Sequence, residues 1–221
     1  MMRRQFDSQL EAMHTKMIQM GALCEDAIAS ASKALLEGDD SLREKAVTLE
    51  RDIDLMERDI ELICYRLLLH QQPIAGDLRQ VTAAQHMIID MERVGDQAAD
   101  IAELAGFMRG SPVKSDIHIA DMARAAIKML TDSIDSYVNG DIALVKTVLV
   151  YDDVVDDLFS KVKGELIAQI LQDSKLAGDC LDLLMIAKYF ERIGDHAQNI
   201  AEWVLYSMTG SRRWIEGEES Q

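Results

Sequence analysis

The sequence predicts an all-α protein built from two tandem antiparallel three-helix bundles related by an internal repeat. A five-residue stretch occurs twice in the 221 residues, as ERVGD at Glu92–Asp96 and as ERIGD at Glu191–Asp195. Two copies 99 positions apart indicate an internal duplication. The hydrophobic content is 48% with only 5% aromatic residues, which is typical of helical cores of aliphatic residues and methionine. Two prolines and 12 glycines are too few for the turns of a β-sandwich.

Three helices are predicted in the first half, with apolar residues spaced by threes and fours. They cover about Phe6–Glu37, Leu42–Gln71 and Ala75–Met108. Gly38 ends the first helix, and the polar side chains of Asp39–Ser41 are suited to cap the second. The second helix has a strict alternation of three and four residues, the pattern of a long bundle helix. Its core-facing positions are Leu49, Ile53, Met56, Ile60, Ile63 and Leu67.

The stretch Arg109–Pro112 breaks the helical pattern, and we place a domain boundary there. The first domain is then residues 1–110, and the second is residues 111–221, which end in a short polar tail. Three further helices are expected in the second domain: from a cap at Ser115 or Asp116 to about Val138, from a cap at Asp141 to about Leu171, and onward from a break at 173–178.

The formal net charge of −16 argues against a nucleic-acid partner, because phosphate recognition needs a basic surface. An acidic chain suits cations or basic surfaces, although acidity also simply favours solubility. Cys24, Cys64 and Cys180 are odd in number and far apart, which indicates buried free thiols in a reducing compartment. The sequence shows neither a signal peptide nor an apolar run of about 20 residues. We therefore expect a cytoplasmic protein.

Acidic pairs spaced four residues apart follow core-facing positions in four of the helices. Residues at this spacing share one helix face, so two such helices packed side by side would gather four carboxylates. Each like-charged pair costs about 0.2–0.5 kcal/mol, and a shared cation is the simplest remedy. Oxygen ligands suit hard or intermediate ions such as magnesium, manganese, calcium or iron rather than soft copper. The candidate ligands are Glu50, Asp54, Glu92 and Asp96 in the first half, extended by Asp100, and Asp152, Asp156, Glu191 and Asp195 in the second half, with Asn199 corresponding to Asp100.

Two other interpretations of these residues stay open. The carboxylates could be solvated flanks of amphipathic helices, neutralised by neighbouring arginines, in a metal-free helical scaffold. The chain could also be a di-metal carboxylate enzyme, since Glu11 and His14 have the spacing of a di-iron bundle motif. Such enzymes need two copies of that motif, and neither Glu92 nor Glu191 has a histidine three residues later. The sequence also lacks a Ser/His/Asp or Cys/His constellation, so we do not expect an enzyme.

Several segments together resemble the PhoU family of phosphate-signalling regulators. They are the opening Phe6–Leu10, the stretch QQPIAGDLR at Gln71–Arg79, the stretch Met91–Asp96, and the stretch ERIGDHAQNIAE at Glu191–Glu202. The resemblance covers nearly the whole chain, and the paired motif makes it more specific than either copy alone.

The resemblance implies two tandem three-helix bundles, each with a metal site of one or more ions held by acidic pairs. Iron, zinc, magnesium and manganese all remain candidates. The family acts without catalysis as a negative regulator: it couples the ATPase subunit of the phosphate ABC transporter to a sensor histidine kinase. The family meets the membrane only through these partners. The resemblance does not decide whether the chain forms a homodimer or whether it is a paralogue that serves another transporter. The implied ligands are Glu50, Asp54, Glu92, Asp96 and Asp100 for the first cluster, and Asp152, Asp156, Glu191, Asp195 and Asn199 for the second.

Overall fold

The computed structural model describes residues 2–70, 75–113 and 117–213, and over these ranges the chain is helical without any strand. The all-α prediction is therefore confirmed. The elements are α1 (Met2–Glu37), α2 (Asp40–His70), α3 (Ala75–Phe107), α4 (Ile119–Asn139), α5 (Ile142–Gln172), the short 3-10 helix η2 (Ser174–Leu176) and α6 (Ala177–Thr209).

Most helix ends lie where the sequence predicts them. Gly38 follows α1 with a φ of 72°, and Gly140 follows α4 with a φ of 61°, a left-handed backbone that favours glycine. Asp39 accepts a hydrogen bond of 2.8 Å from the Ser41 backbone N–H at the start of α2. Asp141 caps α5 by accepting from the two N–H groups of Ala143 and Leu144. These ends are set by local chemistry, which explains why the sequence predicts them.

The start of α4 differs from the prediction. The helix begins at Ile119 with His118 as its N-cap residue, so a cap at Ser115 or Asp116 is wrong; those two residues lie outside the described ranges. The His118 side chain makes no cap hydrogen bond. Instead, its backbone N–H donates to the Glu165 carboxylate of α5 over 3.1 Å. The start of α4 is therefore held by a contact with α5 and not by a side-chain cap from His118.

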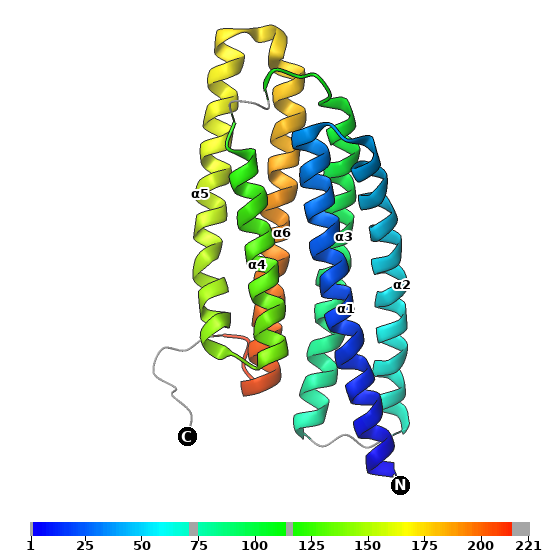
Figure 1. The fold of residues 1–221 in the computed structure, drawn as a ribbon. Coiled ribbons are helices and arrows are strands. Elements are labelled where there is room, and N and C mark those ends of the chain that lie inside the picture. The colour runs from blue at the N-terminus through cyan, green and yellow to red at the C-terminus, as the bar shows by residue number, and fades with distance from the viewer. Residues whose placement is uncertain (1, 71–74, 114–116, 214–221) are drawn as a thin grey trace.

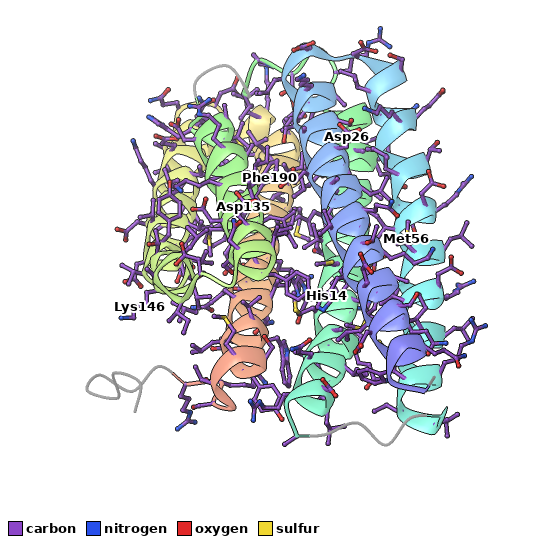
Figure 2. All side chains as sticks on the ribbon, turned by 60° about the horizontal axis from the view of Figure 1, so that its bottom comes forward. His14, Asp26, Met56, Asp135, Lys146 and Phe190 are labelled. Atoms are coloured by element: carbon purple, nitrogen blue, oxygen red, sulfur yellow. The ribbon has the colours of Figure 1, made fainter. Side chains whose placement is uncertain are left out.

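The six α-helices form two bundles that lie side by side with their long axes roughly parallel (Figure 1). Helices α1, α2 and α3 make one bundle, and α4, α5 and α6 make the other. The bundles join where α3 packs along α6 and where α1 meets α4. His14 of α1, labelled in Figure 2, lies at this second junction and hydrogen-bonds the Tyr137 hydroxyl of α4. The predicted pair of tandem three-helix bundles is confirmed.

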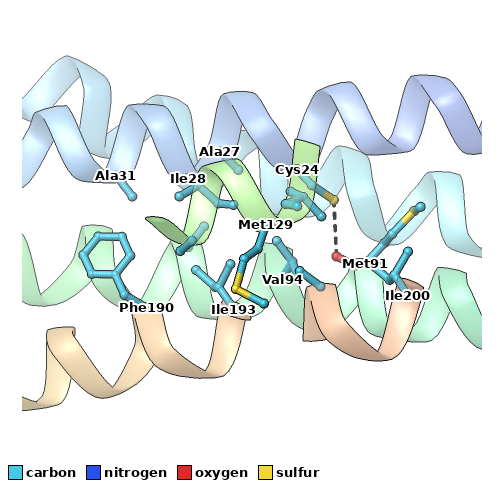
Figure 3. Packing of buried hydrophobic residues seen from close by; sticks show 14 of the residues in the cluster. Cys24, Ala27, Ile28, Ala31, Met91, Val94, Met129, Phe190, Ile193 and Ile200 are labelled. Atoms are coloured by element: carbon cyan, nitrogen blue, oxygen red, sulfur yellow. Dashed lines mark hydrogen bonds between the residues drawn. The ribbon is translucent and has the colours of Figure 1, made fainter. Parts of the chain in front are cut away.

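One continuous hydrophobic core runs through both bundles. Figure 3 shows Met129 and Phe190 from the second half among Ile28 and Val94 from the first. Between α1 and α4 the approach is close, since a Cβ on Gly21 would lie 3.1 Å from side-chain atoms of Ile134. The two halves consequently share part of their apolar packing.

Among the described residues, no helix is both long enough and apolar enough to cross a membrane.

Candidate metal centre

The first acidic cluster lies where α2 packs against α3. Glu50, Asp54 and Asp96 each offer a carboxylate oxygen, and these oxygens all lie within 4.8 Å of one another. The helices come this close because Gly95 has no side chain. A Cβ at this position would lie only 3.0 Å from the Ile53 Cδ1 atom. Ile53 directly precedes Asp54, and Gly95 directly precedes Asp96. The glycine therefore lets the two helices bring their carboxylates together.

Mutual repulsion is visible in the electrostatics of this cluster. Burial raises the pKa of Glu50, and the charges of Asp54 and Asp96 raise it further. Burial also raises the pKa of Glu92, with Asp96 as the next largest cause. Arg93 opposes this effect, because its guanidinium lies 2.9 Å from Asp96 and 3.3 Å from Glu92. Arg51 also lowers the pKa of Glu50, and Arg58 lies 3.8 Å from Asp54, so arginines offset part of the negative charge gathered there.

Glu57 of α2 belongs to the same cluster and is missing from the predicted set. Burial raises its pKa, followed by the charges of Glu61 and Asp54, and its own charge raises the pKa of Glu92 across the helix pair. A signal for it was present in the sequence. Glu57 directly follows Met56, a core-facing position labelled in Figure 2. In the same way, Glu50 follows Leu49 and Asp54 follows Ile53.

The second cluster lies where α5 packs against α6. Burial raises the pKa of Asp152 to about 6, with the charges of Asp195 and Asp156 as the next causes. Asp195 is exposed as a residue, yet partial burial of its carboxyl group and the neighbouring Glu191 charge raise its pKa. Lys188 pairs with Glu191. Among the described residues of this half, no three side chains bring ligand atoms as close together as the first trio does.

The two clusters share a scaffold but differ in charge. A Cβ on Gly194 would lie 3.3 Å from Val155 Cγ1, which repeats the glycine contact of the first cluster. At the position that corresponds to Glu57, 102 residues later, the chain has Phe159. The Lys188 ammonium lies 5.5 Å from the centre of that ring. The two clusters therefore differ at this position, where the first has the Glu57 carboxylate and the second has an aromatic ring close to the Lys188 ammonium.

Asp100 and Asn199 lie at the interface between α3 and α6. Burial and the Asp96 charge raise the pKa of Asp100, while a hydrogen bond from the Tyr189 hydroxyl of α6 lowers it. Asp100 is thus close enough to the first cluster for the charge of Asp96 to raise its pKa. The Asn199 side-chain amide donates to Asp90 of α3 over 3.2 Å. The structure thus directs the amide nitrogen of Asn199 toward α3.

Comparisons with known proteins agree with this architecture. A family model described as the PhoU domain matches residues 17–105 and again residues 119–204. A protein of Pseudomonas aeruginosa named phosphate-specific transport system accessory protein PhoU homolog is 31% identical, with 94% of this chain and 87% of the relative covered. A protein of the same name from Aquifex aeolicus is 36% identical, with 83% of this chain and 84% of the relative covered.

Solved structures show the same likeness. The crystal structure of PhoU from Pseudomonas aeruginosa superimposes with a TM-score of 0.88 at 32% identity, covering 93% of this chain and 100% of that one. The structure of the phosphate transport system regulatory protein PhoU from Streptococcus pneumoniae, at 24% identity, supports the fold with a TM-score of 0.84, covering 95% of this chain and 100% of that one. Two matches of one domain model, relatives of similar length and a shared fold lead to one conclusion: the chain belongs to the PhoU family.

Proposed function

We propose that each acidic cluster binds metal and that the first binds more tightly. The observation that carries this proposal is the gathering of Glu50, Asp54 and Asp96, whose ligand oxygens lie within 4.8 Å of one another. A cation would offset the repulsion that raises the pKa values there. All the donors are oxygen atoms, which fit magnesium, manganese or iron well and also accept zinc. The residues that would hold metal are Glu50, Asp54, Glu92, Asp96 and Asp100 in the first half, with Glu57 in addition, and Asp152, Asp156, Glu191, Asp195 and Asn199 in the second.

Metal would act on the spacing of the helix pairs. Each cluster spans two helices, α2 with α3 and α5 with α6, and a shared ion ties carboxylates from both members of the pair together. Without the ion, the same charges push the pair apart. Binding of metal therefore stiffens the surface that each pair presents, which is a structural role rather than a catalytic one.

We infer that the chain is a non-enzymatic accessory protein of the phosphate-specific transport system. Support comes from relatives bearing that name which align over nearly the whole chain. In this proposal it works in the cytoplasm as a negative regulator, coupling the ATPase subunit of the phosphate ABC transporter to a sensor histidine kinase. It would reach the membrane only through these partners and would restrain phosphate-starvation genes when phosphate is plentiful.

Elemental analysis of the protein purified without chelator tests the metal proposal. We expect Asp96→Ala to remove the metal of the first cluster and Asp195→Ala to remove that of the second. Asp52→Ala and Asp157→Ala are the controls, because both are exposed acidic residues on α2 and α5, the helices that pack against α3 and α6 at the two clusters. Unchanged metal content in the Asp96/Asp195 double variant would show that the metal binds elsewhere. Wild-type protein purified without any metal would favour the metal-free helical scaffold.

Deletion of the gene tests the regulatory proposal. In high phosphate, the deletion strain should produce alkaline phosphatase, and the wild-type gene should restore repression. Output that stays fully repressed in the deletion strain would exclude this regulatory role. Complementation with the Asp96/Asp195 double variant then separates the two proposals, since restored repression would show that regulation does not require the metal sites.

A further inference from the structure

A stack of planar side chains lies where the start of α3 meets the end of α6, at one end of the molecule (Figure 1). His86 of α3 stacks on Trp203 of α6 with ring centres 3.9 Å apart and an angle of 2° between the rings. The guanidinium carbon of Arg212 lies 4.1 Å from the centre of the Trp203 ring. Two groups this close to one ring centre must lie on opposite faces, so Trp203 is held between His86 and Arg212. His86 is nevertheless exposed, which leaves the outer face of its ring open to solvent.

An arginine without a partner lies beside this stack. The Arg79 side chain packs against the end of α6, since a Cβ on Gly210 would lie 3.6 Å from the Arg79 Cδ atom. The Nε atom of Arg79 is buried without a hydrogen-bond partner, and Arg79 makes no ion pair with any described residue. Arg212, by contrast, pairs with Glu202 over 2.7 Å. A buried donor without an acceptor is unfavourable, so Arg79 indicates an acceptor that the described residues do not supply.

Packing of α3 on α6 does not require these side chains. The internal repeat relates this end of the interface to the opposite end, with corresponding residues 99 positions apart. The counterparts are Met185 for His86, Leu104 for Trp203, Gly178 for Arg79 and Val113 for Arg212. Aliphatic residues and glycine therefore serve at the opposite end, where the same two helices meet. The planar and basic side chains call for an explanation other than the fold.

We propose that this end binds a nucleoside diphosphate, with its base on the outer face of His86 and its phosphates on Arg79. Nucleobases stack on the flat faces of histidine rings, whatever the base, because every base has a π-face. Arg79 and His86 are seven residues apart, so they share one face of α3 and lie about 10 Å apart along its axis. A nucleotide spans such a separation from base to phosphate. Its phosphate oxygens would also give the Arg79 Nε atom an acceptor.

The charge distribution favours a small ligand over a longer nucleic acid. The net charge of −16 repels a polyanion that would extend along the molecule. At physiological salt, charges farther away than about 8 Å are largely screened, so a single nucleotide would respond chiefly to the arginines at this end. Inorganic phosphate would use Arg79 but leave the stack without a role. A base joined to phosphates accounts for both features.

Titration calorimetry with ADP tests this proposal, and neither the proposed metal binding nor the proposed regulation enters it. Chelator is present throughout, so that metal cannot bridge the phosphates to the acidic clusters. We expect one ADP to bind per chain, and adenosine and pyrophosphate to bind more weakly by about tenfold or more, because each lacks half of the contacts. No binding of ADP would overturn the proposal. Equal binding of pyrophosphate and ADP would also overturn it, because the base would then make no contribution.

Two variants separate the contacts of the base from those of the phosphates. Arg79→Gln should weaken ADP binding about tenfold or more, toward that of adenosine, through loss of a charge-assisted hydrogen bond. His86→Met, which introduces the side chain of the counterpart Met185, should weaken ADP binding toward that of pyrophosphate. Arg109→Gln is the matched control, because Arg109 is an exposed arginine beyond the opposite end of α3.

Thermal unfolding followed by circular dichroism verifies that each variant is folded. The proposal predicts that only Arg79→Gln and His86→Met weaken ADP binding. If Arg109→Gln weakened it as much as Arg79→Gln, the effect would be one of overall charge and the proposed site would be wrong. If His86→Met left the affinity for ADP unchanged, the base would not stack on His86, which would equally overturn the proposal.

Discussion

Asp152 is the residue at which charge crowding has its clearest consequence. Its carboxyl group faces those of Asp195 and Asp156, and its pKa of about 6 stands well above the ordinary 3.8. A carboxyl group with a raised pKa binds its proton more tightly in the folded chain than in the unfolded one. Its ionisation therefore opposes folding, and stability falls as the pH rises through that window.

Chelator-treated protein should accordingly lose stability between pH 3.8 and about 6, measured by urea unfolding at several pH values. Asp152→Asn should flatten the profile and stabilise the protein at the upper end of the window, because it removes the repelled charge. Asp157→Asn serves as the control on the same helix. A wild-type profile that rises with pH, or one that Asp152→Asn leaves unchanged, would show that crowding at this residue is relieved in another way.

At the scale of the helices, the two motif glycines set how closely each pair packs. Replacing either by alanine should gain up to about 1 kcal/mol of helix propensity, so the fit of the new methyl group decides the sign. At Gly95 it would lie 3.0 Å from Ile53, a fully buried and β-branched side chain. At Gly194 the nearest atoms are 3.3 Å away on Val155 and 3.4 Å away on the flexible Met129.

We therefore expect Gly95→Ala to destabilise the protein by about 1–2 kcal/mol and Gly194→Ala to be neutral or slightly stabilising, in urea unfolding. Adding Ile53→Val to Gly95→Ala removes the nearest atom and should recover part of the loss. If the two alanine variants changed the free energy of unfolding equally, the closer contact at Gly95 would not distinguish the packing of α2 with α3 from that of α5 with α6.

For the whole molecule, the interface between α3 and α6 determines how the halves behave together. Asp90 of α3 accepts hydrogen bonds from His196 over 2.9 Å and from Asn199 over 3.2 Å. Asp100 and Tyr189 occupy the corresponding positions 99 residues away and pair in the same manner. The polar contacts thus follow an internal two-fold symmetry, and the apolar core is continuous beneath them. Such an arrangement favours a single cooperative unit.

Unfolding of the metal-free protein should accordingly be one transition. Trp203 of α6 stacks on His86 of α3 with ring centres 3.9 Å apart, so its fluorescence reports on this interface. The chain has two tryptophans, and Trp214→Phe leaves Trp203 as the only one. Its urea midpoint should coincide with that of far-UV circular dichroism, which follows the helices. An earlier fluorescence transition would mean that the halves separate before they unfold.

Much of this architecture follows from local patterns along the chain. The caps at Asp39 and Asp141 depend on neighbouring residues alone, so the sequence predicts them. The start of α4 depends on Glu165, which is distant in sequence and therefore escapes such prediction. Glu57 belongs to the first cluster by the same register as Glu50, and applying that register one helical turn further along α2 would have found it.

By itself, the sequence determined the helices, their duplication and the register that lines up the acidic pairs, because these depend on periodicity within single helices. Only the tertiary structure decided which helices meet, and with them how closely the carboxylates of each cluster gather and the interface role of Asn199. The physical reason is that a side chain's partner depends on the packing of another helix distant along the chain. Spacing fixes the face on which a residue lies but not what that face contacts.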